Sequence, residues 1–212
     1  MYIIENVVSP IAVLGNTTPA TIDASKSFAK MQPEAGVGIA GVNYYFEITT
    51  VNDIPKGGYF VLIIPTAIGV PSVGSLTLKC SLGCNSGAAT MAWDSSKREL
   101  RVNSGFPTYL SGNSLITFDI SGFTNPSTSD PVTIDFQTYA ALSNGNYIID
   151  QLIGDLEIKA TQGFCTVNEI FPTDDNRIYA IPGNYTVDMS CVSTIEPLHG
   201  VRLTFPEEFY VV

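Results

Sequence analysis

Four cysteines are the residues whose type and spacing most readily suggest chemistry. Cys80 and Cys84 are separated by Ser-Leu-Gly, and Cys165 and Cys191 form a second, wider pair. An even number of cysteines in two pairs fits two disulfides, and the alternative is a set of metal-binding thiolates. The alternative is weaker because the two pairs are far apart and the single histidine, His199, is remote from Cys80 and Cys84. Disulfides imply an oxidising compartment.

Residues that could catalyse a reaction are few. A Ser-His or Cys-His pair would need His199, which lies in a Pro-Leu-His-Gly turn sequence. The adjacent acids Asp174-Asp175 and Glu207-Glu208 point apart or into solvent on a strand or loop, which does not suit acid–base catalysis. We therefore predict a non-enzyme with no catalytic residues and no cofactor. No metal site is predicted either, because the alternating acids of a calcium loop are missing, although Ca²⁺ between domains stays open.

Two Asn-x-Ser/Thr sequons could carry glycans, at Asn16 and at Asn184. A chain of this composition carries such sequons by chance, so an unmodified turn is the alternative at each. Because the disulfides indicate secretion, we expect N-glycosylation at one or both asparagines.

Composition excludes several classes of protein. The chain has 212 residues, of which 45% are hydrophobic and 14% charged, which is enough for a core. The net charge of −10 argues against nucleic acid as a partner. No apolar run approaches the roughly 18–20 residues of a membrane-spanning helix, so no membrane insertion is predicted. Met1 is followed at once by a strand-like sequence without a leader pattern, which suggests mature sequence or an excerpt of a longer polypeptide.

The chain repeats part of itself. Residues 2–13 align with residues 147–158, and residues 43–65 align with residues 184–206 at a slightly shorter spacing. The matches keep their order in both blocks, although any two alternating strands look somewhat alike. Real duplication means one full unit and the start of another, and such arrays usually build or bind rather than catalyse.

The alignment also bears on the wider cysteine pair. Cys165 aligns with Ala20 and Cys191 with Thr50, so both cysteines are present in one unit and both are absent from the other. Joint presence and joint absence are expected of disulfide partners. We predict a Cys165–Cys191 disulfide, which leaves Cys80 and Cys84 to pair with each other across a tight loop.

A two-residue hydrophobic period, with turn residues every 8–12 positions, predicts an all-β protein. Only residues 23–33 could form a turn or two of helix. Many short antiparallel strands at this spacing indicate a β-sandwich. The predicted strands are residues 2–8, 11–14, 43–51, 58–66, 75–80, 88–93, 98–103, 114–121, 131–139, 146–153, 155–160, 185–193 and 201–212.

Matching turn sequences, Ser9-Pro10 and Gly154-Asp155, are interpreted as junctions between units. The predicted organisation is an N-terminal strand within residues 1–10, a complete sandwich domain in 11–153, and a second, incomplete or smaller domain in 154–212. The first strand aligns with the last strand of the complete domain and has no domain of its own. It would complete a preceding unit or insert into another molecule, through the assembly residues Tyr2, Ile3, Ile4, Val7 and Val8.

Three segments carry a resemblance to a family: NDIPKGGYFVLIIP (52–65), the stretch 112–138 with its Ile-x-Gly-x-x-Asn-Pro strand exit, and NYIID (146–150). They resemble the immunoglobulin-like repeats of large surface and fibril-forming proteins of ciliates and similar protists. The resemblance covers most of residues 43–150 and part of 184–206. It implies an immunoglobulin-like sandwich, an extracellular structural role and no catalytic residues.

Repeat, composition and resemblance together predict a structural subunit of an extracellular filament or cell-surface coat. Its partners would be copies of itself, joined into a linear or helical homopolymer, and its attached glycans. The alternative is an adhesin or carbohydrate-binding surface module, for which exposed aromatic residues beside acids would be the discriminating feature.

Overall fold

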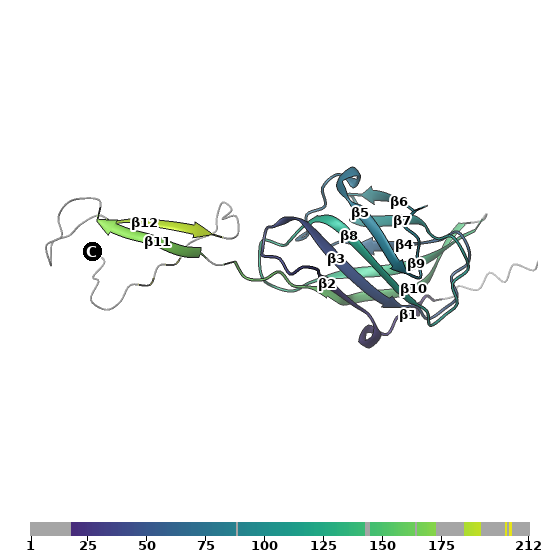
Figure 1. The fold of residues 1–212 in the computed structure, drawn as a ribbon. Helices are drawn as coiled ribbons and strands as arrows, with labels where there is room; N and C mark the ends of the chain where they lie inside the picture. The colour runs from purple at the N-terminus through teal and green to yellow at the C-terminus, as the bar shows by residue number, and fades with distance from the viewer. Residues whose placement is uncertain are drawn as a thin grey trace, which may run out of the picture.

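The computed structural model describes residues 18–87, 89–142, 145–163, 165–172 and 185–191, together with residues 202 and 204. Within these ranges, two β-sheets pack face to face, and a separate two-stranded sheet follows them in the chain (Figure 1). The predicted N-terminal strand with Tyr2, Ile3, Ile4, Val7 and Val8, both sequons at Asn16 and Asn184, and His199 all lie outside the described residues.

The larger sheet of the sandwich, sheet A, has six strands in the order β1 (Ala20–Thr21), β10 (Gly145–Ile158), β9 (Val132–Leu142), β4 (Gly58–Ile63), β7 (Glu99–Phe106) and β6 (Thr90–Asp94). Sheet B has four, in the order β2 (Phe28–Met31), β3 (Ala40–Thr49), β8 (Leu115–Thr124) and β5 (Thr77–Leu82). The separate sheet pairs β11 (Cys165–Pro172) with β12 (Tyr185–Cys191). Two 3-10 helices, η1 (Ala24–Lys26) and η2 (Val73–Ser75), complete the described elements.

The strand order is that of an immunoglobulin-like sandwich. Strands β2-β3-β8-β5 take the places of A-B-E-D, and β4-β9-β10 take those of C-F-G. The β6–β7 hairpin extends sheet A beyond β4 and falls in sequence between the strands at D and E. The sheet pairings are antiparallel except for the short parallel contact between β1 and β10. The predicted all-β, immunoglobulin-like fold is confirmed.

Alternating side chains place the core between the two sheets. On β3, Tyr44, Phe46 and Ile48 are fully buried, while the residues between them face outward. β4 lies between two other strands and is buried along almost its whole length, as its unbroken apolar sequence requires. At the centre, the ring centroid of Phe60 lies 4.7 Å from that of Phe118 and 5.6 Å from that of Phe136. Aromatic residues from both sheets therefore meet there.

The predicted domain boundary between residues 153 and 154 is wrong in position. β10 continues through Gly154 to Ile158, and Leu156 and Ile158 are buried in the same core as the rest of the sandwich. Gly154 has a φ of +78° inside a register shift of β10 against β9, and its N–H donates to Asp135 Oδ1 at 2.8 Å. The turn-like sequence is therefore an irregularity within one strand.

Three strands were absent from the sequence prediction, and one of them is the two-residue strand β1. Residues 23–33 form one short 3-10 turn, capped by the Asp23 side chain, and then enter β2. β11 was missed as well. β2 and β11 are edge strands with mixed polarity, which leaves a weak hydrophobic period in the sequence.

Candidate functional site

The two-stranded sheet β11–β12, called here the C-terminal hairpin, repeats the pairing of β2 with β3. In the sandwich, Met31 pairs with Tyr44 and Ala29 pairs with Phe46. In the C-terminal hairpin, Pro172 pairs with Tyr185 and Ile170 pairs with Val187. The stretches between these paired residues, 32–43 and 173–184, are equally long, so one spacing aligns both strands of one hairpin with both strands of the other. The register supports the internal repeat seen in the sequence.

This register corrects one detail of the sequence alignment. Because β11 aligns with β2 at the same spacing as β12 aligns with β3, Cys165 corresponds to Ala24 rather than Ala20. The sequence alignment had used the wider spacing of the N-terminal block for this cysteine.

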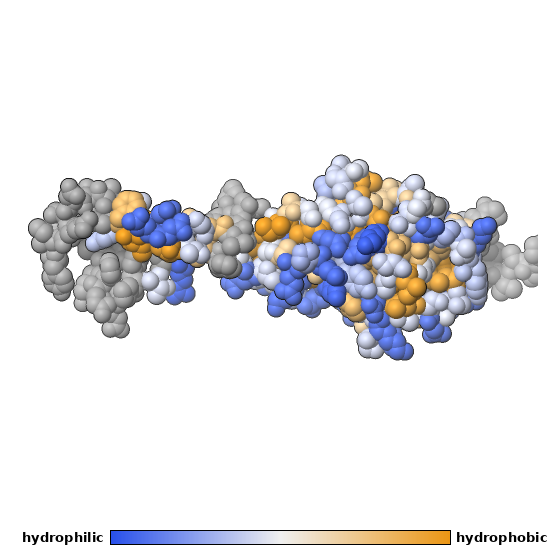
Figure 2. Space-filling view, viewed as in Figure 1, coloured by the Kyte–Doolittle hydropathy of each residue, from blue (hydrophilic) through white to orange (hydrophobic). Residues whose placement is uncertain are grey.

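One face of the C-terminal hairpin is apolar. Cross-strand neighbours alternate between two faces, and one face collects a set of apolar side chains and the disulfide: Val167, Ile170, Tyr185, Val187, Met189, Cys165 and Cys191. Val167 is 46% exposed and Ile170 is 52% exposed. Figure 2 shows hydrophobic atoms of the hairpin at its surface. At the corresponding place in the sandwich, Ala29 is 9% exposed and packs into the core.

The opposite face of the C-terminal hairpin is mainly polar. Thr166, Glu169, Asp188 and Ser190 are on this face, and Phe171 is its exposed apolar member. At the register shift of β11, the Asn168 side chain donates to the Ser190 hydroxyl across the two strands at 2.8 Å. The hairpin thus has one apolar and one mainly polar face, as expected for a strand pair that packs on a core.

Both predicted disulfides are present. Cys165 and Cys191 are directly paired residues at the start of β11 and the end of β12, with their Cα atoms 4.0 Å apart. An isolated two-stranded hairpin is marginally stable, and a cross-strand disulfide limits the freedom of its unfolded chain. The corresponding residues of the sandwich are Ala24, which lies in η1, and Thr50, which directly follows β3.

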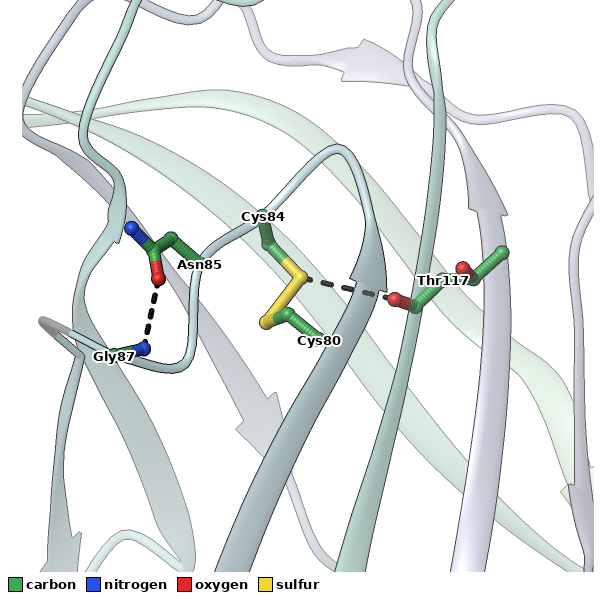
Figure 3. The surroundings of a disulfide bond; sticks show 5 residues. All are labelled: Cys80, Cys84, Asn85, Gly87 and Thr117. Carbon is green, nitrogen blue, oxygen red and sulfur yellow. Dashed lines mark hydrogen bonds between the residues drawn. A yellow bond between two sulfur atoms is a disulfide. The ribbon is translucent and has the colours of Figure 1, made fainter.

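The second disulfide closes a loop at the end of β5 (Figure 3). Cys80 and Cys84 flank a tight turn in which Gly83 has a φ of +71°. The Cys84 sulfur lies 3.8 Å from the Thr117 carbonyl oxygen on β8, and Asn85 accepts a hydrogen bond from the Gly87 N–H at 2.7 Å. The disulfide therefore fixes the edge of sheet B beside β8.

A buried carboxylate ties the last strand of the sandwich to the turn after β3. Asp150 on β10 is fully buried. It accepts hydrogen bonds from the Val51 N–H at 3.0 Å, the Asn52 N–H at 3.2 Å and the Asn52 side-chain amide at 3.0 Å. These donors satisfy the carboxylate inside the core, so Asp150 holds the two sheets together rather than taking part in a reaction.

A second buried contact fixes the start of β3. The Tyr44 hydroxyl donates to Asn125 Oδ1 at 2.9 Å, and the Asn125 amide donates to the carbonyls of Ala35 and Gly36 at 3.2 and 2.7 Å. Burial raises the pKa of Tyr44 well above its usual range, so it stays a neutral donor. Tyr185, at the corresponding place in the C-terminal hairpin, is 54% exposed.

The outer face of sheet B carries an aromatic pair with charged neighbours. The rings of Phe28 and Tyr45 are 6.0 Å apart, and the Lys30 ammonium lies 5.6 and 5.2 Å from their centres. The Tyr45 hydroxyl donates to Glu47 at 3.0 Å. Burial, followed by this hydrogen bond and the Glu47 charge, raises the pKa of Tyr45. Phe28 is 40% exposed, so an apolar surface lies beside an acid and a base.

The described ranges contain no group of three or more His, Cys, Asp or Glu side chains placed to hold a metal ion. Among the described helical segments, none has the length and apolar character needed to cross a bilayer. The acids Asp174, Asp175, Glu207 and Glu208 lie outside the described part of the chain.

No protein-family model matches this chain, and no curated protein matches its sequence. Solved structures match at the level of fold. One is the collagen-binding domain of a Staphylococcus aureus adhesin, at 10% identity and a TM-score of 0.36, over 63% of this chain and 97% of that one. Another, an uncharacterised Nocardia farcinica protein with an immunoglobulin-like fold, has 16% identity and a TM-score of 0.36, over 57% of this chain and 81% of that one.

A third match is a C-terminal fragment of the major pilin of Streptococcus agalactiae, at 9% identity and a TM-score of 0.38, over 67% of this chain and 57% of that one. These structures are bacterial, whereas the sequence segments resembled proteins of protists. Likenesses this weak give no information about function, which has to be argued from the chain itself.

Proposed function

We propose that this protein is a structural subunit of an extracellular filament or cell-surface coat, built from immunoglobulin-like units that join end to end. One observation carries the proposal: the C-terminal hairpin has the register of β2–β3 and exposes the face that β2–β3 buries. A strand pair of this kind is half of a core, and proteins avoid leaving such a face in water. In the proposed assembly, a neighbouring unit supplies the layer that covers this face, and this contact joins one unit to the next.

The described structure favours assembly over catalysis. Its buried polar groups, Asp150 and Asn125, hold loops and strands in place through satisfied hydrogen bonds. Both disulfides strengthen edges, one at β5 and one across the C-terminal hairpin. Reinforced edges and a head-to-tail contact suit a protein that carries load between neighbours.

The extracellular setting and the glycans are part of the same proposal. Disulfides at Cys80–Cys84 and Cys165–Cys191 need an oxidising compartment. In such a compartment the sequons at Asn16 and Asn184 are the expected sites of N-glycosylation. The intact mass of native material, before and after glycosidase treatment, tests this part: an unchanged mass would remove the glycans from the proposal.

The assembly is tested by sedimentation and electron microscopy of the purified chain over a range of concentrations. We expect concentration-dependent oligomers or filaments from the wild type. Ile170→Asp should remain monomeric, because it places a charge on the apolar face. Thr166→Asp is the matched control, since it adds the same charge to the polar face and should assemble like the wild type. A wild-type chain that stays monomeric at all concentrations would contradict the proposed function.

An adhesive surface module is the second candidate, favoured by the Phe28–Tyr45 pair with Lys30 and Glu47 on the outer face of sheet B. Aromatic faces next to hydrogen-bonding groups are suited to stacking against a sugar ring. A glycan array probed with the wild type and with Tyr45→Ala would decide. Binding that is lost in Tyr45→Ala supports this candidate, and the absence of binding by the wild type removes it.

A further inference from the structure

Within the sandwich, β10 is the strand of sheet A that packs against β2 of sheet B. The two strands are in contact although they belong to different sheets. Leu156 and Ile158 from β10 share one buried cluster with Ala29 and Met31 from β2. This is a contact between side chains across two layers, since the backbone of β10 is hydrogen-bonded to β9 and β1.

Each of these two strands has a counterpart elsewhere in the sequence. β11 corresponds to β2 by register, as shown above. Residues 2–13 correspond to β10 by sequence, with Ile11 at the place of Leu156 and Val13 at the place of Ile158. The pair of elements that forms the β2–β10 contact is therefore present a second time in the chain.

The structure of β10 also explains how residues 2–13 can act as one strand in spite of Pro10. Pro10 aligns with Asp155, which lies in the stretch where β10 has no ladder partner on β9 between Leu152 and Leu156. A proline lacks the N–H that ladder pairing needs and is tolerated at such an irregularity. We therefore include residues 9–13 in the proposed donor segment.

We propose that the apolar face of the C-terminal hairpin binds residues 2–13 of a second copy of this chain, with Ile11 packed against Ile170. This rests on the proposed function and names the two surfaces of the joint. Ile170 stands where Ala29 stands in the sandwich, and its larger, half-exposed side chain offers more apolar surface to an incoming strand. Val187 and Met189 continue the same face on β12.

A second copy, rather than the same copy, supplies the strand because of chain direction. β1 runs parallel to β10, so the chain enters β1 from the side of the sandwich on which β10 begins. β11 follows the end of β10, and the C-terminal hairpin lies beyond the sandwich in Figure 1. The described chain therefore enters the sandwich at the end opposite to the one from which it leaves toward β11. A contact between opposite ends is heterologous and generates an open chain of subunits.

Photo-crosslinking tests the joint. A benzophenone amino acid is placed at residue 11 of isotopically heavy chains, which are mixed with light chains and allowed to assemble. We expect heavy-to-light crosslinks from residue 11 to β11 or β12. The matched control is residue 12, which aligns with the exposed Glu157 and should give at least about tenfold less crosslink to the hairpin. Ile170→Asp should abolish the residue 11 crosslink, and Thr166→Asp should preserve it.

The outcomes separate this inference from the proposed function. Oligomers whose residue 11 crosslinks to the sandwich, to its own chain or to no site on the hairpin would overturn the inference and leave the filament proposal standing. Equal crosslinking from residues 11 and 12 would overturn it as well. If no oligomers form at all, the proposed function fails, and the inference fails with it.

Discussion

The two hairpins of this chain, β2–β3 and β11–β12, share a strand register and an apolar face but differ in their surroundings. β2–β3 lies in a four-stranded sheet whose inner face meets sheet A, and Tyr44, Phe46 and Ile48 are fully buried there. In β11–β12 the same face carries Ile170 and Val167, each about half exposed. Local sequence therefore sets the pairing of the two strands in each hairpin, while burial of their apolar face depends on a second layer.

The comparison also explains where covalent support is found. β3 has β2 on one side, β8 on the other and a core beneath it, so its pairing is held by packing. The C-terminal hairpin has a disulfide between directly paired residues instead. Stabilisation that comes from layers in one hairpin comes from a covalent bond in the other.

The largest contrast should appear when an apolar side chain is removed from each setting. Phe60→Ala in the sandwich core should lower the free energy of unfolding by about 3–5 kcal/mol, since it leaves a cavity between the two sheets, beside Phe118 and Phe136. Ile170→Ala should leave sandwich unfolding unchanged. Denaturation followed by fluorescence of Trp93, the single tryptophan and a β6 residue, reports on the sandwich. A comparable loss in Ile170→Ala would mean that the C-terminal hairpin packs on the sandwich.

Removal of each disulfide should show how much more the C-terminal hairpin depends on a covalent bond than the sandwich does. Cys165→Ser with Cys191→Ser should destabilise the C-terminal hairpin by roughly 3 kcal/mol, from the loop it closes. Its amides should then exchange with solvent at the rate of an unfolded segment, while those of β3 and β8 stay protected. The Cys80–Cys84 disulfide closes a much shorter loop, so Cys80→Ser with Cys84→Ser should cost less stability. Hydrogen-exchange mass spectrometry measures both, and protection of β12 that survives loss of Cys165 would contradict this account.

Removal of the buried carboxylate should have a smaller effect. Asp150→Ala leaves the N–H groups of Val51 and Asn52 without their acceptor, which should cost about 1–3 kcal/mol of stability. Asp155→Ala, an exposed acid on the same strand, serves as the control. Chemical denaturation of the two variants gives the difference. Equal stability would show that Asp150 does not tie β10 to the turn after β3.

The smallest expected effect is a pH dependence at Asp53, which follows β3 in the sandwich and aligns with Thr194. Hydrogen bonds from the Tyr109 hydroxyl and then the Gly112 N–H hold the pKa of Asp53 below its usual value. A lowered folded-state pKa adds stability above the unfolded pKa of about 3.9, and this is lost as the pH falls through the folded value. Asp53→Asn should therefore flatten the acid limb of a stability–pH curve, and an acid limb identical to that of the wild type would contradict this.

Much of the fold could be predicted from sequence because period-two patterns mark half-buried strands. β3, β4, β8 and β9 were placed within a few residues, and the disulfide partners followed from the repeat. β2 and β11 were missed since an edge strand of four or eight residues with mixed polarity has little periodicity. The boundary at Gly154 was misplaced because a glycine with positive φ occurs both in turns and in strand irregularities, and the sequence does not distinguish the two.

The candidate site was only partly accessible from sequence. The alignment predicts an assembly strand and a second unit, but the exposed face needs the register of β11 against β12. A one-residue shift at Asn168 decides which side chains share that face, and no sequence pattern marks such a shift. The contact between β2 and β10 was equally hidden, because packing across layers joins strands that are distant in sequence.

The claim that the C-terminal hairpin is covered by the N-terminal strand of another copy is tested most directly by deletion of residues 1–13. Hydrogen exchange of the β11 and β12 amides is compared between the assembled wild type and the shortened chain. The account predicts slow exchange in the wild type, fast exchange after the deletion, and an unchanged sandwich in a monomeric protein. Filaments that still form, with the hairpin equally protected, would contradict it.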